Sequence, residues 1–233
     1  MVRWLLLAVF LAVFLAGVPL GMLLLHELPP AGPVRAELMA QARARGGEWV
    51  PLTNVPRALR EAIIATEDAR FYEHHGLDLI GFARAVLANI EAGRPMQGGS
   101  TITQQLAKRY LGREEPTLRR KLLVLAMAVK LEQAYSKDEL LEMYLNSVYF
   151  GPYAYGIGAA ARVYFHKPAS ALNLTEATLL AGLPQAPALY DPLHRLDRVK
   201  ARQDAVISAM TRQGYLTPEE ARQARATPTA LDR

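Results

Sequence analysis

The sequence contains no cysteine. This absence excludes a disulfide-bonded scaffold, a zinc site with cysteine ligands, an iron–sulfur cluster and a thiol nucleophile. It does not exclude an exported protein, because a chain of 233 residues can bury a sufficient core without disulfides. The sequence also lacks long runs of alternating polar and apolar residues, and it has no internal repeat. These absences favour a mainly α-helical domain.

The excess of positive charge is small. The chain has 27 Lys and Arg against 22 Asp and Glu, which gives a net charge of +5. There is no pattern of aromatic residues for stacking on bases, so nucleic acid is a poor candidate partner. Neither the phosphate-binding pattern G-x-x-x-x-G-K-[ST] nor the zinc-binding pattern H-E-x-x-H occurs, and we predict no protein-built metal site.

Hydrophobic residues make up 51% of the chain and are concentrated at its N-terminus. Residues 4–25 carry no charge, and a helix of about 22 residues is roughly 33 Å long, enough to cross a bilayer core. The alternative is a cleaved signal peptide, whose apolar region would be shorter, about 7–15 residues. The length favours an uncleaved anchor. Arg3 weakly favours a cytoplasmic N-terminus, although the charge bias alone leaves the orientation open.

The predicted organisation has three parts. Residues 1–25 form a cytoplasmic stub and a transmembrane anchor, residues 26–47 a stalk rich in Pro and Gly, and residues 48–233 one domain. Capping patterns and apolar spacing indicate the main helices of this domain. They are expected over residues 56–66, 78–93, 100–111, 116–134, 136–146, 195–212 and from 217 onward.

The densest polar cluster, residues 67–76, lies where one amphipathic helix ends and before the next begins. Such junctions often project side chains into a cleft. A carboxylate here, beside apolar Phe71 and Ile64, would have a raised pKa and could act as a base. Residue types alone favour the plainer alternative, a solvated helix end with a surface ion pair. His74 and His75 could be metal ligands, but adjacent histidines point in different directions and no metal-binding spacing occurs, so we predict a structural hydrogen bond for His74.

Two further polar stretches suit phosphate. Gly98 and Gly99 precede a helix that Ser100 could cap, and the free N–H groups of a helix N-terminus attract anions. Lys108 lies two turns further along. A basic stretch follows at residues 113–121, where charge-assisted hydrogen bonds could hold a pyrophosphate. The plainer alternatives are a common glycine turn and a solvated basic face.

In this order, the clusters resemble the peptidoglycan glycosyltransferase family, which includes the transglycosylase module of class A penicillin-binding proteins and monofunctional relatives. Residues 67–76 fit E-D-x-x-F-x-x-H-x-G, and residues 98–108 fit G-x-S-T-I-T-Q-Q-x-x-K. Arg120 and Lys121 begin R-K-x-x-E, and residues 137–167 fit K-x-x-x-L-E-x-Y-L-N followed by G-x-G-x-x-A-x-x-Y-F-x-K. The resemblance implies a mainly α, lysozyme-like domain with an N-terminal transmembrane helix. It also implies polymerisation of lipid II into β-1,4-linked glycan strands with release of polyprenyl pyrophosphate.

The resemblance further implies roles for individual residues. Glu67 would be the general base that takes the proton from the 4-hydroxyl of the acceptor sugar. Positive charge near the leaving pyrophosphate would come from basic side chains or from a divalent cation, Mg²⁺ or Mn²⁺. The predicted substrate-binding residues are Asp68, Phe71, Ser100, Thr101, Gln104, Gln105, Lys108, Arg120 and Lys121.

The implied setting is the external, periplasmic side of a bacterial inner membrane, with a single membrane span. The partners would be lipid II, the nascent glycan strand, the membrane and other wall-synthesis proteins. No transpeptidase activity is expected, because neither S-x-x-K nor K-T-G occurs.

Two positions depart from the family pattern. Val124 stands where R-K-x-x-E has its second glutamate, and Arg109 stands where the family usually has Asn. If the missing glutamate acts in acid–base catalysis, its loss costs about 10²–10⁴ in rate. Three hypotheses follow: a slow glycosyltransferase, a non-catalytic relative that binds lipid II or glycan and scaffolds wall synthesis, and a lytic transglycosylase. Cleavage of glycan needs neither a membrane span nor phosphate sites, which argues against the third.

Overall fold

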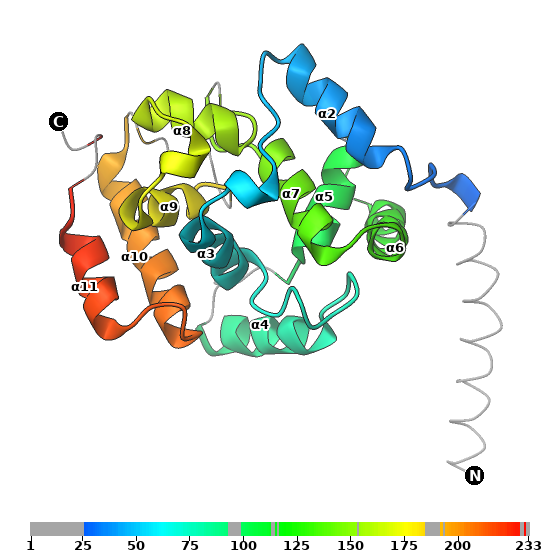
Figure 1. The fold of residues 1–233 in the computed structure, drawn as a ribbon. Helices are drawn as coiled ribbons and strands as arrows, with labels where there is room; N and C mark the ends of the chain where they lie inside the picture. Colours follow the sequence, from blue (N-terminus) through cyan, green and yellow to red (C-terminus); the bar gives the residue numbers. More distant parts are fainter. Residues whose placement is uncertain are drawn as a thin grey trace, which may run out of the picture.

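The computed structural model describes residues 26–92, 99–112, 115, 117–152, 154–184, 192, 194–228 and 231. Across these residues ten α-helices, α2–α11, enclose one core. Figure 1 shows how these helices are arranged. The sole β pairing in this part of the chain is an isolated bridge between Tyr149 and Tyr155. The mainly α class is therefore confirmed. No helix among the described residues is long and apolar enough to cross a membrane, and the predicted anchor, residues 4–25, lies outside them.

The helix bounds agree closely with the capping patterns of the sequence. Two short 3₁₀ turns, Leu52–Asn54 and Ala169–Ala171, connect longer elements. The α-helices are α2 (Val34–Ala44), α3 (Arg57–Glu67), α4 (Leu79–Ala92), α5 (Ile102–Tyr110), α6 (Leu118–Ala134), α7 (Lys137–Ser147), α8 (Ile157–Phe165), α9 (Leu174–Ala181), α10 (Leu196–Arg212) and α11 (Pro218–Ala226).

Helix α7 lies at the centre of the core. Its residues 140–146 are all buried, so the helix is covered on every side, by α2, α5, α6 and α8. On the other side of the molecule, α3 packs against α9 and α10. In Figure 1, α3 lies between the α9–α10 pair and the group formed by α5 and α7. The C-terminal end of α3 is thereby held where these two groups meet.

Local capping chemistry determines where several helices begin. The predicted capping boxes of α7 and α11 are present, with Ser136 paired to Glu139 and Thr217 paired to Glu220. The predicted cap of α5 was wrong by one residue. Thr101 takes this position instead of Ser100, and its Oγ1 accepts the N–H of Gln104 at 3.1 Å.

The segment predicted as a stalk packs onto the domain. Val34 and Leu38 lie one turn apart on α2 and are buried in the core. Arg35 donates to the Glu142 carboxylate on α7 at 2.7 Å, and Trp49 Nε1 and the Leu52 N–H donate to the same group. Burial alone would raise the pKa of Glu142, but these hydrogen bonds together lower it. Residues 34–52 are therefore anchored to α7 by both apolar and charged contacts.

Candidate active site

A cavity of about 610 Å³ lies beside the C-terminal end of α3. Four segments line it: the end of α3, the first half of α4, the start of α5 and one face of α10. The acidic residues that line it are Glu67, Asp68 and Asp78, and the basic ones are Arg84, Arg202 and Arg212. The cavity thus brings acidic side chains together with three arginines, and guanidinium groups can bind phosphate by charge-assisted hydrogen bonds.

The Glu67 carboxylate is held in one orientation. Gln105 Nε2 on α5 donates to Glu67 Oε2 at 2.7 Å, and Tyr144 on α7 in turn donates to Gln105 Oε1 at 3.3 Å. Burial raises the pKa of Glu67, and the Gln105 hydrogen bond with the charges of Arg202 and Arg109 opposes this rise only in part. A fixed carboxylate with a raised pKa at a cavity wall is well suited to accept a proton.

Asp68 holds the end of α3 in place. Its buried carboxylate accepts the Ile102 N–H at 3.0 Å and hydrogen bonds from His74 Nε2 at 2.9 and 3.0 Å. Because Gly76 N–H donates to His74 Nδ1 at 3.2 Å, the proton of the imidazole is on Nε2. The structural hydrogen-bonding role predicted for His74 is confirmed. This network joins α3, the loop 68–78 and the start of α5.

Thr101 and Gln104 hold the same loop from the other side. Thr101 Oγ1 donates to the Gly76 carbonyl at 2.9 Å, and Gln104 Nε2 donates to it at 3.0 Å. Gly76 has a φ of +86°, and a Cβ there would lie 3.3 Å from the backbone of Ala128, so glycine is required. The N–H groups of Ile102 and Gln104 are already engaged by side chains, which reduces the capacity of this helix end for phosphate.

Phe71 lies in the core rather than at the cavity wall. Its side chain is fully buried, and Lys137 Nζ lies 4.5 Å from the ring centroid. Lys137 also pairs with Glu132 at 2.8 Å, and Thr103 Oγ1 donates to that carboxylate at 2.5 Å. Phe71 therefore supports the loop 68–78 from beneath.

The predicted phosphate-binding cations lie away from this cavity, on α5 and α6. Lys108 and Lys121 are exposed, whereas Arg120 is buried and donates to the Gly112 carbonyl. Val124, one turn after Arg120, is partly buried and packs against the hydrophobic core. The structure therefore brings Glu67, Asp68, Ser100 and Thr101 together and leaves the α5–α6 cations as a separate basic region. Ser100 is exposed at the cavity wall.

Sequence reasoning missed the three arginines of the cavity. Arg202, Ala205, Ala209 and Arg212 recur at intervals of three, four and three residues, which places them on one face of α10. Small residues between two arginines leave room for a ligand, so this spacing was a usable signal. The sequence contained no such signal for Arg84, because it resembles any exposed residue of an amphipathic helix.

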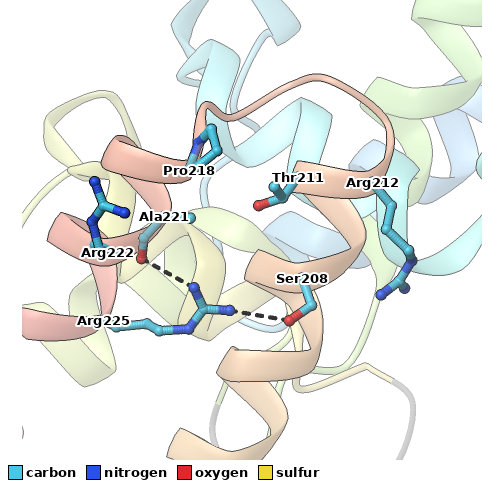
Figure 2. A pocket seen from close by; sticks show the side chains of 7 residues that line it. All are labelled: Ser208, Thr211, Arg212, Pro218, Ala221, Arg222 and Arg225. Atoms are coloured by element: carbon cyan, nitrogen blue, oxygen red, sulfur yellow. Dashed lines mark hydrogen bonds between the residues drawn. The ribbon is translucent and has the colours of Figure 1, made fainter.

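A second hollow, of about 430 Å³, lies between α10 and α11 (Figure 2). Figure 2 shows Arg225 reaching from α11 to Ser208 on α10 and to the carbonyl of Ala221. Its hydrogen bond to Ser208 Oγ is 3.0 Å long. Arg225 also pairs with Asp204 at 3.0 Å. No carboxylate lines this hollow, and its central arginine joins the two helices. The first cavity is therefore the better candidate for chemistry.

The described residues include no group of three or more His, Asp or Glu side chains that could hold a metal ion. Val124, at the position of the second family glutamate, has no ligand atom.

The chain is similar to known proteins over most of its length. The model of the Transglycosylase family matches residues 35–211. The chain is 46% identical over 189 residues to penicillin-binding protein 1A of Escherichia coli (strain K12), covering 81% of this chain and 22% of that protein. It is 43% identical over 199 residues to penicillin-binding protein 1F of Bacillus subtilis (strain 168), covering 85% and 28%.

A crystal structure of penicillin-binding protein 1A from Haemophilus influenzae aligns with a TM-score of 0.48 at 26% identity, over 78% of this chain and 18% of that one. The chain spans less than a third of the length of the curated relatives above.

Proposed function

The chain belongs to the Transglycosylase family, as a module homologous to the glycosyltransferase domains of class A penicillin-binding proteins, and from this premise we propose that it polymerises lipid II into β-1,4-linked glycan strands. The observation that carries the proposal is the oriented Glu67 carboxylate, which shares its cavity with three arginines. The products would be a glycan longer by one unit and polyprenyl pyrophosphate.

The proposed reaction is a single displacement with inversion. Glu67 accepts the proton of the 4-hydroxyl of the acceptor sugar, and the oxygen forms a bond to the anomeric carbon of the lipid-linked donor. The bond between that carbon and the pyrophosphate oxygen breaks, and the pyrophosphate leaves with the electron pair. Burial makes Glu67 a stronger base than a solvated carboxylate, because it raises the pKa of the group.

Positive charge near the leaving group stabilises the negative charge that develops on it. Arg84, Arg202 and Arg212 line the same cavity as Glu67 and are proposed to supply this charge. Lys108 and Lys121 are exposed on neighbouring helices and are proposed to bind phosphate of the second lipid-linked substrate. Ser100, exposed at the cavity wall, is proposed to contact sugar or phosphate oxygens, whereas the buried Thr101 hydroxyl is already engaged by Gly76 and Gln104.

Helix α4 carries an unusually apolar exposed surface next to the cavity. Leu79, Leu87 and Ile90 are 76%, 62% and 70% exposed, and Phe82 is half exposed while it lines the cavity. Figure 1 shows α4 along the lower edge of the molecule. Exposed apolar patches of this kind mark contacts with lipid or with partners. We propose that α4 lies against the outer leaflet of the inner membrane and receives the polyprenyl tail.

Charges on α4 should impair the use of long-tailed substrate. The double variant Leu87→Glu/Ile90→Glu is expected to raise the KM for lipid II with a full polyprenyl tail about tenfold or more, because each buried CH₂ contributes roughly 0.8 kcal/mol. The KM for a water-soluble short-tailed analogue should be unchanged. Gln223→Glu/Ala226→Glu adds the same charges at the same spacing on exposed α11 and serves as the control. Equal losses with both substrates would contradict a membrane role for α4.

The test of the proposed function is polymerisation of purified lipid II by the full chain in a lipid bilayer. Glycan polymer should appear, and each glycosidic bond formed should release one polyprenyl pyrophosphate. The alternative that Val124 favours is a relative that binds lipid II or glycan and scaffolds wall synthesis. Binding of lipid II without any polymer would support that alternative, and release of anhydro-muropeptides from isolated walls would instead indicate a lytic enzyme.

A further inference from the structure

Arg109 occupies a position on α5 that a solvated arginine would not take. It lies four residues after Gln105, so both side chains are on the same face of the helix, and Gln105 is hydrogen-bonded to Glu67. Arg109 is partly buried, and its Nε is buried without a hydrogen-bond partner. Buried guanidinium groups normally pair their N–H groups, so a stabilising charge nearby is needed.

Glu67 supplies a negative charge that acts on Arg109. The groups whose charges act on Arg109 are Tyr144, Glu67 and Tyr155, and of these Glu67 alone is a carboxylate. Burial lowers the pKa of Arg109, but a guanidinium remains protonated at neutral pH. The two residues, with Gln105 and Tyr144, form one cluster contributed by α3, α5 and α7.

The other charged groups around Glu67 are placed differently from Arg109. Arg202 from α10 lines the cavity, whereas the neighbouring Asp68 carboxylate is buried and already accepts hydrogen bonds from His74 and the Ile102 N–H. Arg109 does not line the cavity. A bound pyrophosphate would engage Arg202 and add negative charge beside Glu67, which favours protonation of the carboxylate. Arg109 lies outside this lining, so its charge would continue to act on Glu67.

We propose that Arg109 is a positioning residue for the proposed reaction, holding the Glu67 carboxylate in the ionised form that accepts the proton while the pyrophosphate is bound. The inference rests on the proposed function for its consequence in turnover. Arg109 stands where the family usually has the neutral residue Asn, so this electrostatic support is a property of this chain's own sequence.

The pH dependence of lipid II polymerisation tests the proposal. In Arg109→Asn the acidic limb of the kcat profile should move upward by about half a pH unit or more, because a nearby opposite charge is removed. The rate should therefore fall about threefold or more at pH 6 and change little at pH 8.5. Arg109→Lys should retain the profile of the wild type. Arg43→Asn, an equal charge change on the exposed face of α2, is the control. A purely structural role would lower the rate equally at every pH and would overturn the proposal.

A second measurement does not depend on turnover. The side-chain carboxyl carbon of Glu67 can be followed by ¹³C NMR in the detergent-solubilised full chain, with Glu67→Gln used to assign its signal. The midpoint of its titration should be higher in Arg109→Asn than in the wild type, and unchanged in Arg43→Asn. An unchanged midpoint would refute the proposal even in an active enzyme. A raised midpoint in a chain that makes no polymer would support the electrostatic contact and refute the proposed function alone.

Discussion

Replacement of Glu67 by glutamine is expected to lower the rate of lipid II polymerisation by at least about 10²–10⁴-fold, the usual contribution of a general base. Gln has nearly the same shape as Glu, and its carbonyl can still accept the hydrogen bond from Gln105. An amide cannot take a proton from the acceptor hydroxyl at neutral pH. The loss should therefore appear in kcat, whereas the affinity for lipid II should change little.

The same substitution should leave the fold as stable as before or more stable. Burial raises the pKa of Glu67 in the folded state above its unfolded value. The folded state therefore binds the proton on Glu67 more tightly than the unfolded state does. Protonated Glu67 stabilises the fold below the unfolded-state pKa, and this stabilisation is lost as the pH rises through the folded-state pKa. At neutral pH an ionised Glu67 costs folding free energy, and a neutral Gln removes that cost. Thermal unfolding at pH 7 should give a Tm equal to or above that of the wild type.

A matched control lies on the same helix. Glu61 pairs with Arg57 on α3, at 2.6 Å, and Glu61→Gln removes one carboxylate without touching the cavity. Its effect on the polymerisation rate should be less than about twofold, because exposed pairs of this kind contribute little to stability. If Glu67→Gln kept more than a tenth of the wild-type rate, another group would have to be the base.

The fold was predictable wherever local chemistry determines it. The capping boxes at Ser136 and Thr217 depend on a side chain and a backbone N–H three residues apart, so the sequence alone indicates them. At α5 two neighbouring residues could cap the helix. The choice of Thr101 coincides with a hydrogen bond to the Gly76 carbonyl, a contact 25 residues away. Such a contact is invisible in the local pattern.

The site was predictable only for residues within the motifs. Glu67 and Gln105 were both expected at the site, but their hydrogen bond depends on how α3 and α5 approach each other. Arg202 and Arg212 follow Glu67 by more than a hundred residues, and the packing of α10 on α3 brings them to the same cavity. The predicted roles of Asp68 and Phe71 rested on the family resemblance, which does not distinguish a group that touches substrate from one that supports the loop.

Restoring the missing glutamate should raise the activity. Val124→Glu is expected to increase the polymerisation rate by about 10²–10⁴-fold, the usual contribution of an acid–base group. Arg120 and Lys121 lie four and three residues before position 124, so all three share a face of α6. A carboxylate there would be next to cations that can orient it. Initial rates with purified lipid II, compared at equal protein concentration, measure the effect.

The substitution has a cost in stability, which defines the necessary control. Val124 is partly buried against the core, so a charged side chain there should lower the free energy of unfolding by about 1–3 kcal/mol. Val124→Gln introduces a polar side chain of the same length without the charge and should cost a similar amount. If only the glutamate variant gains rate, the carboxylate is responsible rather than a loosened α6.

The outcomes of this comparison separate the hypotheses for the chain. A slow wild type that Val124→Glu accelerates is a glycosyltransferase working on Glu67 and its surrounding arginines alone. Polymer from Val124→Glu but none from the wild type would identify the wild type as a lipid II-binding scaffold with an otherwise intact site. A fast wild type that the glutamate does not improve would mean that the reaction needs no second glutamate, as expected if Arg84, Arg202 and Arg212 stabilise the leaving pyrophosphate. In that case, Arg84→Gln should cause the loss in kcat that the missing glutamate does not.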